Sequence, residues 1–149
     1  MPDVTLTWFE MQYAAAVGAA RQLSAIGNGR KHHPYGVPAD EWGVHIEGAV
    51  GELAVAKHLN LYWEPVLKKP REANGDVQGH EVRATTRPRG CLILHPEDPD
   101  EAPFWLALTH AKPVVTILGP CLGIYGKQQQ WWRTDTGRPA YFVPQTALA

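Results

Sequence analysis

The stretch that decides the fold of this 149-residue chain is Gly75-Asp76-Val77-Gln78-Gly79-His80-Glu81-Val82-Arg83. Asp76 follows an Asn74-Gly75 turn signal, and the residues from 81 to 86 have the composition of a strand. Residues two apart on a strand share a face, so Glu81 and Arg83 point the same way, and we expect a preceding strand to bring Asp76 beside them. Two carboxylates and a guanidinium on one face predict a site for a hard metal ion and a phosphate.

The same residues also allow a purely structural interpretation. Glu81 and Arg83 then form an ion pair on one face of the strand, and Asp76 is a turn residue. His80, next to Glu81, is the first candidate for an additional base if the site is catalytic.

Two helices are expected before this stretch. The first covers about residues 7–26 and ends at Gly27-Asn28-Gly29, and the second begins at an Asp40 cap and ends near Asn60. The apolar side of the first helix is expected to comprise Phe9, Tyr13, Ala16, Val17, Ala20 and Leu23. In the second helix Gly48 and Gly51 leave one side nearly without side chains, so that side can approach a sheet and hold Glu52 at the boundary.

Short extended segments dominate the rest of the chain. They are expected at residues 61–63, 66–67, 92–94, 104–109 and 114–118, and a polar segment at 126–138 is expected to begin as a helix. Between 88 and 103, prolines favour a strand and an irregular loop over a helix. The fold class is therefore α/β (α+β): one domain over residues 1–149 with two N-terminal helices followed by a mixed sheet of about five strands.

The charge is distributed unevenly. The formal net charge is −1, which excludes a polycation that coats nucleic acid, yet the window from residue 68 to 89 is basic. Contacts to nucleic acid are therefore expected from a local patch, and its candidate residues are Lys68, Lys69, Thr85, Arg87 and Arg89. Trp131 and Trp132 can stack on bases, although packing in a core or an interface is the commoner role of such residues.

The cysteines and the N-terminus bear on location. Cys91 and Cys121 stand far apart in apolar surroundings, which favours buried free thiols in a reducing cytoplasm over a disulfide or a metal pair. The first residues lack a secretory signal, and no segment is long and apolar enough to suggest a membrane span. We therefore expect a cytoplasmic protein with no membrane contact.

Gly51-Glu52 on a helix, Gly75-Asp76 and then Glu81-Val82-Arg83 together resemble the PD-(D/E)XK nuclease superfamily. The resemblance covers about residues 41–118 and implies a restriction-endonuclease-like core. It implies that Glu52, Asp76 and Glu81 bind one or two Mg²⁺ (or Mn²⁺) ions and that Arg83 stands where the family usually has lysine. Arginine stays protonated, so Arg83 would orient water or stabilise the phosphate rather than act as a base.

The function that the resemblance implies is metal-dependent hydrolysis of phosphodiester bonds in nucleic acid, most simply DNA. The small size and the closing Tyr141-Phe142-Val143-Pro144-Gln145 resemble single-domain members from phages and prophages, which implies the cytoplasm of a bacterium or an infected host. Cutting both strands of a duplex at once would require a homodimer.

Two other classes remain open. One is a nucleic-acid-binding module that keeps the nuclease scaffold without hydrolysis, which the arginine at position 83 and the near-zero net charge fit. The other is a structural or regulatory phage protein whose apolar aromatic surface serves assembly.

Overall fold

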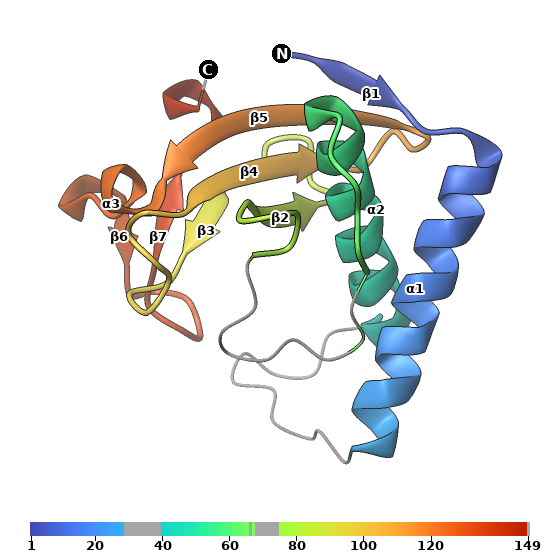
Figure 1. The fold of residues 1–149 in the computed structure, drawn as a ribbon. Helices are drawn as coiled ribbons and strands as arrows, with labels where there is room; N and C mark the ends of the chain where they lie inside the picture. Colours follow the sequence, from blue (N-terminus) through green and yellow to red (C-terminus); the bar gives the residue numbers. More distant parts are fainter. Residues whose placement is uncertain (29–39, 66, 68–74, 149) are drawn as a thin grey trace.

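The structure is a computed structural model that describes residues 1–28, 40–65, 67 and 75–148 (Figure 1). Its elements are mixed α/β. In chain order they are β1 (Asp3–Thr5), α1 (Trp8–Gly27), α2 (Glu41–Leu59), β2 (Glu81–Thr85), β3 (Leu92–Leu94), β4 (Pro103–Leu108), β5 (Val114–Leu122), α3 (Gly123–Gly126), β6 (Trp132–Arg133) and β7 (Ala140–Val143). Two short 3-10 turns, Gln129–Trp131 and Gln145–Ala147, complete the chain.

The two expected N-terminal helices are confirmed, and the sequence explains where each begins. Thr7 caps α1 through a reciprocal pair of hydrogen bonds with Glu10, a capping box. Asp40 caps α2 by accepting from the Gly43 backbone N–H at 2.8 Å. At its other end α2 stops at Asn60, which adopts the left-handed conformation that ends many helices.

Small residues bring the layers together. A Cβ placed on Gly18 of α1 would lie 2.5 Å from the Ile46 Cα of α2, and one placed on Gly51 would lie 2.9 Å from the Ala84 Cβ of β2. The expected smooth side of α2 is therefore confirmed at Gly51. A Cβ placed on Gly48 would meet nothing within 4 Å, so Gly48 is not part of that contact.

The strands form two sheets. The first has the order β1-β5-β4-β2, with β2 and β4 parallel and the other neighbours antiparallel, and the second is the antiparallel sheet β3-β7-β6. The expected single sheet of about five strands is wrong in this respect. The pairing of β3 with β7 joins residues 92–94 to residues 141–143, a long-range contact that no local pattern contains.

The first sheet has a core on each of its faces. On one face, residues of α1 and α2 pack against Val82, Trp105 and Ala107. On the other face, Phe104, Leu106 and Leu108 pack against the second sheet. Figure 1 shows this arrangement, with α1 and α2 on one side and β3, β6 and β7 on the other. Successive residues of β2 therefore alternate between the helices and the second sheet.

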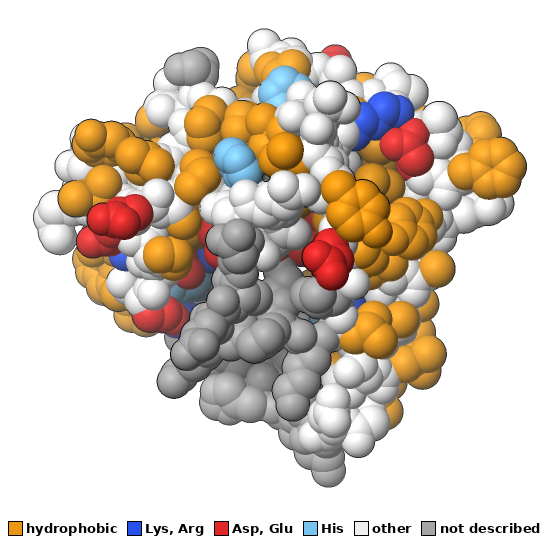
Figure 2. Space-filling view, in the orientation of Figure 1, with side chains coloured by type: hydrophobic (Ala, Val, Ile, Leu, Met, Phe, Trp, Pro, Cys, Tyr) orange, Lys and Arg blue, Asp and Glu red, His pale blue; other side chains and the backbone are white. Residues whose placement is uncertain are grey.

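The expected apolar side of α1 is only partly correct. Ala14, Val17 and Gly18 are buried, whereas Phe9 is 83% exposed and Leu23 is 60% exposed. The reason is the close approach at Gly18, which turns the small side chains of α1 toward α2 and the larger ones toward solvent. Figure 2 shows hydrophobic side chains at the surface over α1, on the right of the view.

Three expectations for the extended part have mixed outcomes. Residues 61–65 form no strand, although Trp63 is buried and packs edge-on against Tyr13, and Val66 lies outside the described residues. The segment 126–138, expected to begin as a helix, starts at the last residue of the four-residue α3 and continues into a 3-10 turn and β6. Residues 86–102, all of them described, contain turns and β3 and no helix, as the prolines favour.

No helix in the described part of the chain is long and apolar enough to cross a membrane.

Candidate functional site

Asp76 lies in a tight turn directly before β2. The turn runs from Val77 to His80, and its two central residues, Gln78 and Gly79, both have positive φ, 42° and 88°. Two positive φ values in succession are typical of the turns that connect hairpin strands. The expected strand carrying Asp76 is therefore wrong: Asp76 lies in a turn, and the pairing here among the described residues is a single bridge between Val77 and His80.

The turn still places the Asp76 carboxylate at the start of β2. Its Oδ2 accepts a hydrogen bond from the Val82 backbone N–H at 2.7 Å, while the Asp76 backbone N–H donates to the His80 carbonyl at 2.8 Å. Asp76 and Glu81 thus lie at the same end of the strand. His80 is held in place as well, since its Nδ1 accepts from the indole N–H of Trp105 at 2.9 Å.

Glu81 and Arg83 share a face of β2, as expected. Arg83 Nη1 lies 3.7 Å from Glu81 Oε2, and Arg83 Nη2 donates to both carboxylate oxygens of Asp98 at 3.1 Å. The guanidinium also lies 5.2 Å from the centre of the Phe104 ring. Because Phe104 belongs to the core beside the second sheet, Glu81 and Arg83 face that sheet.

Glu52 occupies a different environment. It is 4% exposed on α2 and forms an ion pair with Arg21 of α1 at 2.7 Å. Its neighbour Gly51 contacts Ala84, which faces the helices. In the described part of the chain no group of three or more His, Cys, Asp or Glu side chains could hold a metal ion. Asp76 and Glu81 both lie at the start of β2, and Glu52, paired with Arg21, forms no metal-binding group of three with them.

A second turn, after β2, carries two arginines. Gly90 N–H donates to the Arg87 carbonyl at 2.9 Å and closes a turn with Pro88 and Arg89 in the middle. Gln145 Nε2 donates to the carbonyl oxygens of Pro88 and Gly90, each at 2.9 Å, and the Arg87 N–H donates to Thr85 Oγ1 at 3.1 Å. These bonds fix the backbone from which both guanidinium groups extend.

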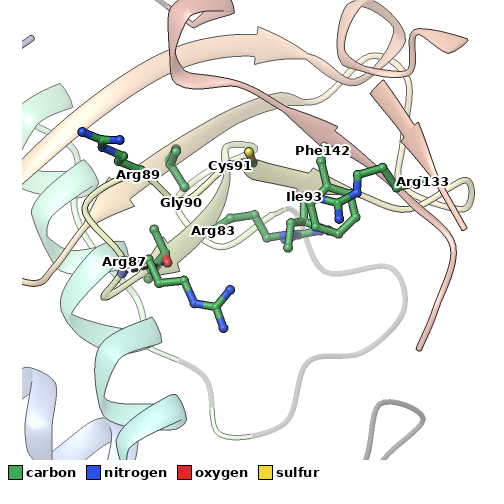
Figure 3. Close-up of a pocket in the computed structure, with 11 residues that line it drawn as sticks. Arg83, Arg87, Arg89, Gly90, Cys91, Ile93, Arg133 and Phe142 are labelled. Atoms are coloured by element: carbon green, nitrogen blue, oxygen red, sulfur yellow. Dashed lines mark hydrogen bonds between the residues drawn. The ribbon is translucent and has the colours of Figure 1, made fainter. Parts of the chain in front are cut away.

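Arg87 and Arg89 line a cavity between β2 and the second sheet, which we call the arginine pocket. Its volume is about 500 Å³, and its lining includes Arg83, Thr85, Arg87, Arg89, Arg133 and Phe142. Figure 3 shows Arg87 and Arg89 at one end and Arg133 with Phe142 at the other. Of the described residues that line it, none is acidic. The pocket concentrates positive charge in a chain whose formal net charge is −1.

The four arginines differ in their partners. Arg83 is held by Asp98, and Arg133 makes two hydrogen bonds with Asp135, at 3.0 and 2.8 Å, which raise the pKa of Arg133 and lower that of Asp135. Among the described residues, the guanidinium groups of Arg87 and Arg89 have no hydrogen bond or ion pair. Two unneutralised cations on a rigid turn favour an anionic ligand.

An adjoining pocket of about 510 Å³ shares Arg83, Arg87, Ile93 and Phe142 with the arginine pocket. It also contains His95. Burial lowers the pKa of His95 below its ordinary value, the Asp98 carboxylate opposes this shift, and the Arg83 guanidinium adds to it. His95 is therefore neutral at pH 7.

The predicted nucleic-acid contacts fall into two sets. Thr85, Arg87 and Arg89 line the arginine pocket together, whereas Lys68 and Lys69 lie outside the described residues. Sequence reasoning missed Arg133, Phe142, Asp98 and Gln145. All four lie outside residues 68–89, and the signals near them were the Trp131-Trp132 pair considered for base stacking and the closing run of residues 141–145, which was not connected with this site. Cys91 also lines the pocket, and both cysteines are free and half-buried.

Comparison with known protein families, curated proteins and solved structures found no match for this chain. The site must therefore be interpreted from its own chemistry. That chemistry is a pair of carboxylates at the start of β2, an arginine held beside them, and a pocket of arginines along the same face of the strand.

Proposed function

We propose that this protein is a metal-dependent nuclease that binds DNA in the arginine pocket and hydrolyses phosphodiester bonds beside Asp76 and Glu81. The observation that supports this most is the continuity of the two features. Arg83 lines the arginine pocket and lies 3.7 Å from Glu81, while Asp76 accepts a hydrogen bond from the residue between them. A DNA strand with a phosphate in the pocket can therefore place a neighbouring phosphate beside Asp76 and Glu81.

The arginines supply the binding. Guanidinium groups bind phosphate oxygens with two parallel hydrogen bonds, and a charged donor strengthens each of them. Arg87 and Arg89 suit this role because no described carboxylate neutralises them and because the turn that carries them is fixed by Gln145.

The carboxylates suit a magnesium ion. Mg²⁺ is usually held by one or two carboxylates together with substrate phosphate oxygens and waters, so Asp76 and Glu81 provide enough protein ligands. The Glu81 carboxylate has only the long contact with Arg83 among the described residues, which leaves its oxygens available. Glu52, which is paired with Arg21, is not required as a third protein ligand in this proposal. A bound Mg²⁺ would supply charge relief on the phosphate and an acidified water.

Arg83 positions the phosphate in this proposal. A guanidinium cannot accept a proton at any useful pH, so Arg83 stabilises charge instead of acting as the base. Its two hydrogen bonds with Asp98 fix the guanidinium over Phe104 and leave Nη1 directed toward Glu81. Asp98 is thus a positioning residue that the sequence did not reveal.

The proposal includes a restriction-endonuclease-like core in a variant form. Supporting it are the packing of α2 against β2 and β4 and the order of helix, turn and strand around the candidate residues. The departure is the connection between β3 and β4, in which residues 95–102 form turns where the family usually has a helix.

A second candidate function is DNA binding without hydrolysis. The observation that favours it is the engagement of Arg83, whose Nη2 is committed to Asp98 at the position where the family usually has a lysine. In this case the arginine pocket is the whole of the function, and Asp76 serves only to shape the turn before β2.

Cleavage assays separate the two candidates. We expect the wild-type protein with Mg²⁺ to degrade labelled DNA, and we expect Asp76→Ala and Glu81→Ala to reduce the rate by at least about 100-fold, while both variants keep DNA binding in EDTA. Glu101→Ala, which removes an exposed carboxylate outside the pocket, is the matched control. Equal cleavage by all four proteins contradicts the assignment of the carboxylates, and binding without cleavage by wild type supports the second candidate.

A further inference from the structure

Each of the two adjoining pockets combines cationic and apolar side chains. The arginine pocket holds four arginines together with Ile93 and Phe142, and the adjoining pocket holds Arg83, Arg87 and Arg138 together with Ile93, Ala140 and Phe142. Phe142 and Ile93 line both pockets because they are paired across β7 and β3. A ligand in either pocket therefore meets guanidinium groups and an apolar, aromatic wall together.

Phe142 is also paired with a cation. The Arg133 guanidinium lies 4.7 Å from the centre of the Phe142 ring, and the Arg133 side chain is 50% exposed. A planar guanidinium over an aromatic ring is a surface on which a third flat group can stack. Nucleic-acid bases are such groups, and each base stacked on an aromatic side chain contributes measurably to binding.

We propose that the substrate of the arginine pocket is single-stranded nucleic acid, with phosphates on Arg87 and Arg89 and an unpaired base against Phe142 and Arg133. This inference rests on the proposed function and specifies its substrate. A duplex presents phosphates on its outside and keeps its bases stacked within, so it cannot place a base against Phe142. A single strand presents both phosphates and unpaired bases, which matches a pocket that holds guanidinium groups beside an aromatic ring.

The test compares binding by fluorescence anisotropy in EDTA, where no hydrolysis occurs. The ligands are a fluorescein-labelled 15-nucleotide DNA of mixed sequence, the same strand annealed to its complement, and a strand of the same length in which most bases are replaced by abasic sites. We expect the wild-type protein to bind the normal single strand at least five-fold more tightly than either of the other two. This comparison needs no variant, so it does not depend on the folding of any mutant.

Variants then locate the base. Phe142→Leu is expected to weaken binding of the normal strand at least five-fold and to leave the abasic strand within two-fold, whereas Phe142→Tyr, which keeps the ring, is expected to retain wild-type affinity. Equal affinity for single strand and duplex, or equal affinity for normal and abasic strands, overturns the inference while the proposed function stands. Failure of the wild-type protein to bind any of the three DNAs overturns both.

Discussion

At the scale of single residues, Arg83 connects the two parts of the candidate site. It contacts Glu81 on its own strand, donates twice to Asp98, and lines the arginine pocket. The two-residue period of a strand is enough to predict the shared face of Glu81 and Arg83. Asp98 could not be predicted in this way, because the loop that carries it has no periodic pattern and returns to β2 only in the folded chain.

His95 provides a prediction at this scale. Burial lowers its pKa in the folded protein, so below pH 6.5, the ordinary value, the unfolded chain binds a proton that the folded chain does not. The free energy of unfolding should therefore fall as the pH falls from about 6.5 toward the lowered pKa. His95→Gln removes this contribution. We expect urea unfolding at pH 7.5 and pH 5.5 to show a larger loss of stability in wild type than in the variant, and equal losses would contradict it.

At the scale of elements, two glycines of α2 that look alike in the sequence differ in the fold. Gly51→Ala would place a methyl group 2.9 Å from the Ala84 Cβ and 3.2 Å from the Ala107 Cβ, so we expect it to lower the free energy of unfolding by about 1–3 kcal/mol. Gly48→Ala meets nothing within 4 Å and should raise it by about 0.5–1 kcal/mol, because alanine is the better helix former. Urea unfolding of both variants provides the measurement, and effects of the same sign would contradict the packing of α2 on β2.

The turn with Arg87 and Arg89 gives a second prediction for an element. Gln145→Ala removes the two hydrogen bonds that fix the turn and leaves every charge in place. We expect it to weaken DNA binding about three- to ten-fold because the arginines lose a fixed geometry. Thr146→Ala, at the exposed neighbouring position, is the control. Affinity unchanged by Gln145→Ala would show that the turn needs no such anchor.

The elements also mark how far prediction from the sequence extends. Caps and apolar periodicity predict α1 and α2, and short β-rich runs predict β3, β4 and β5, because these signals are local. The sequence predicts a strand carrying Asp76 where the structure has the Gln78-Gly79 turn, since a positive φ at glutamine leaves no clear mark in composition. The β3–β7 pairing and the return of Gln145 to the Arg87 turn depend on contacts between distant parts of the chain, which no window on the sequence contains.

At the scale of the whole molecule, the two sheets determine where charge accumulates. The first sheet packs against the helices with one face and against the second sheet with the other. Between the two sheets lies a cavity lined by arginines from β2, from the turn after it and from β6. A chain with a formal net charge of −1 therefore contains a pocket with two arginines, Arg87 and Arg89, that no described carboxylate neutralises. Because one chain has one such pocket among its described residues, cleavage of both strands of a duplex would still require a homodimer, which stays a prediction.

The measurement that tests the central claim most directly is the salt dependence of DNA binding in EDTA. Each phosphate contact in a single strand contributes about 0.7 to the slope of log affinity against log salt concentration. We predict that Arg87→Ala combined with Arg89→Ala lowers this slope by about 1.4 and weakens binding at least ten-fold at low salt. Lys57→Ala, which removes a charge near the N-terminal strand, should leave the slope unchanged. An unchanged slope in the double variant would contradict the binding of DNA phosphates in the arginine pocket.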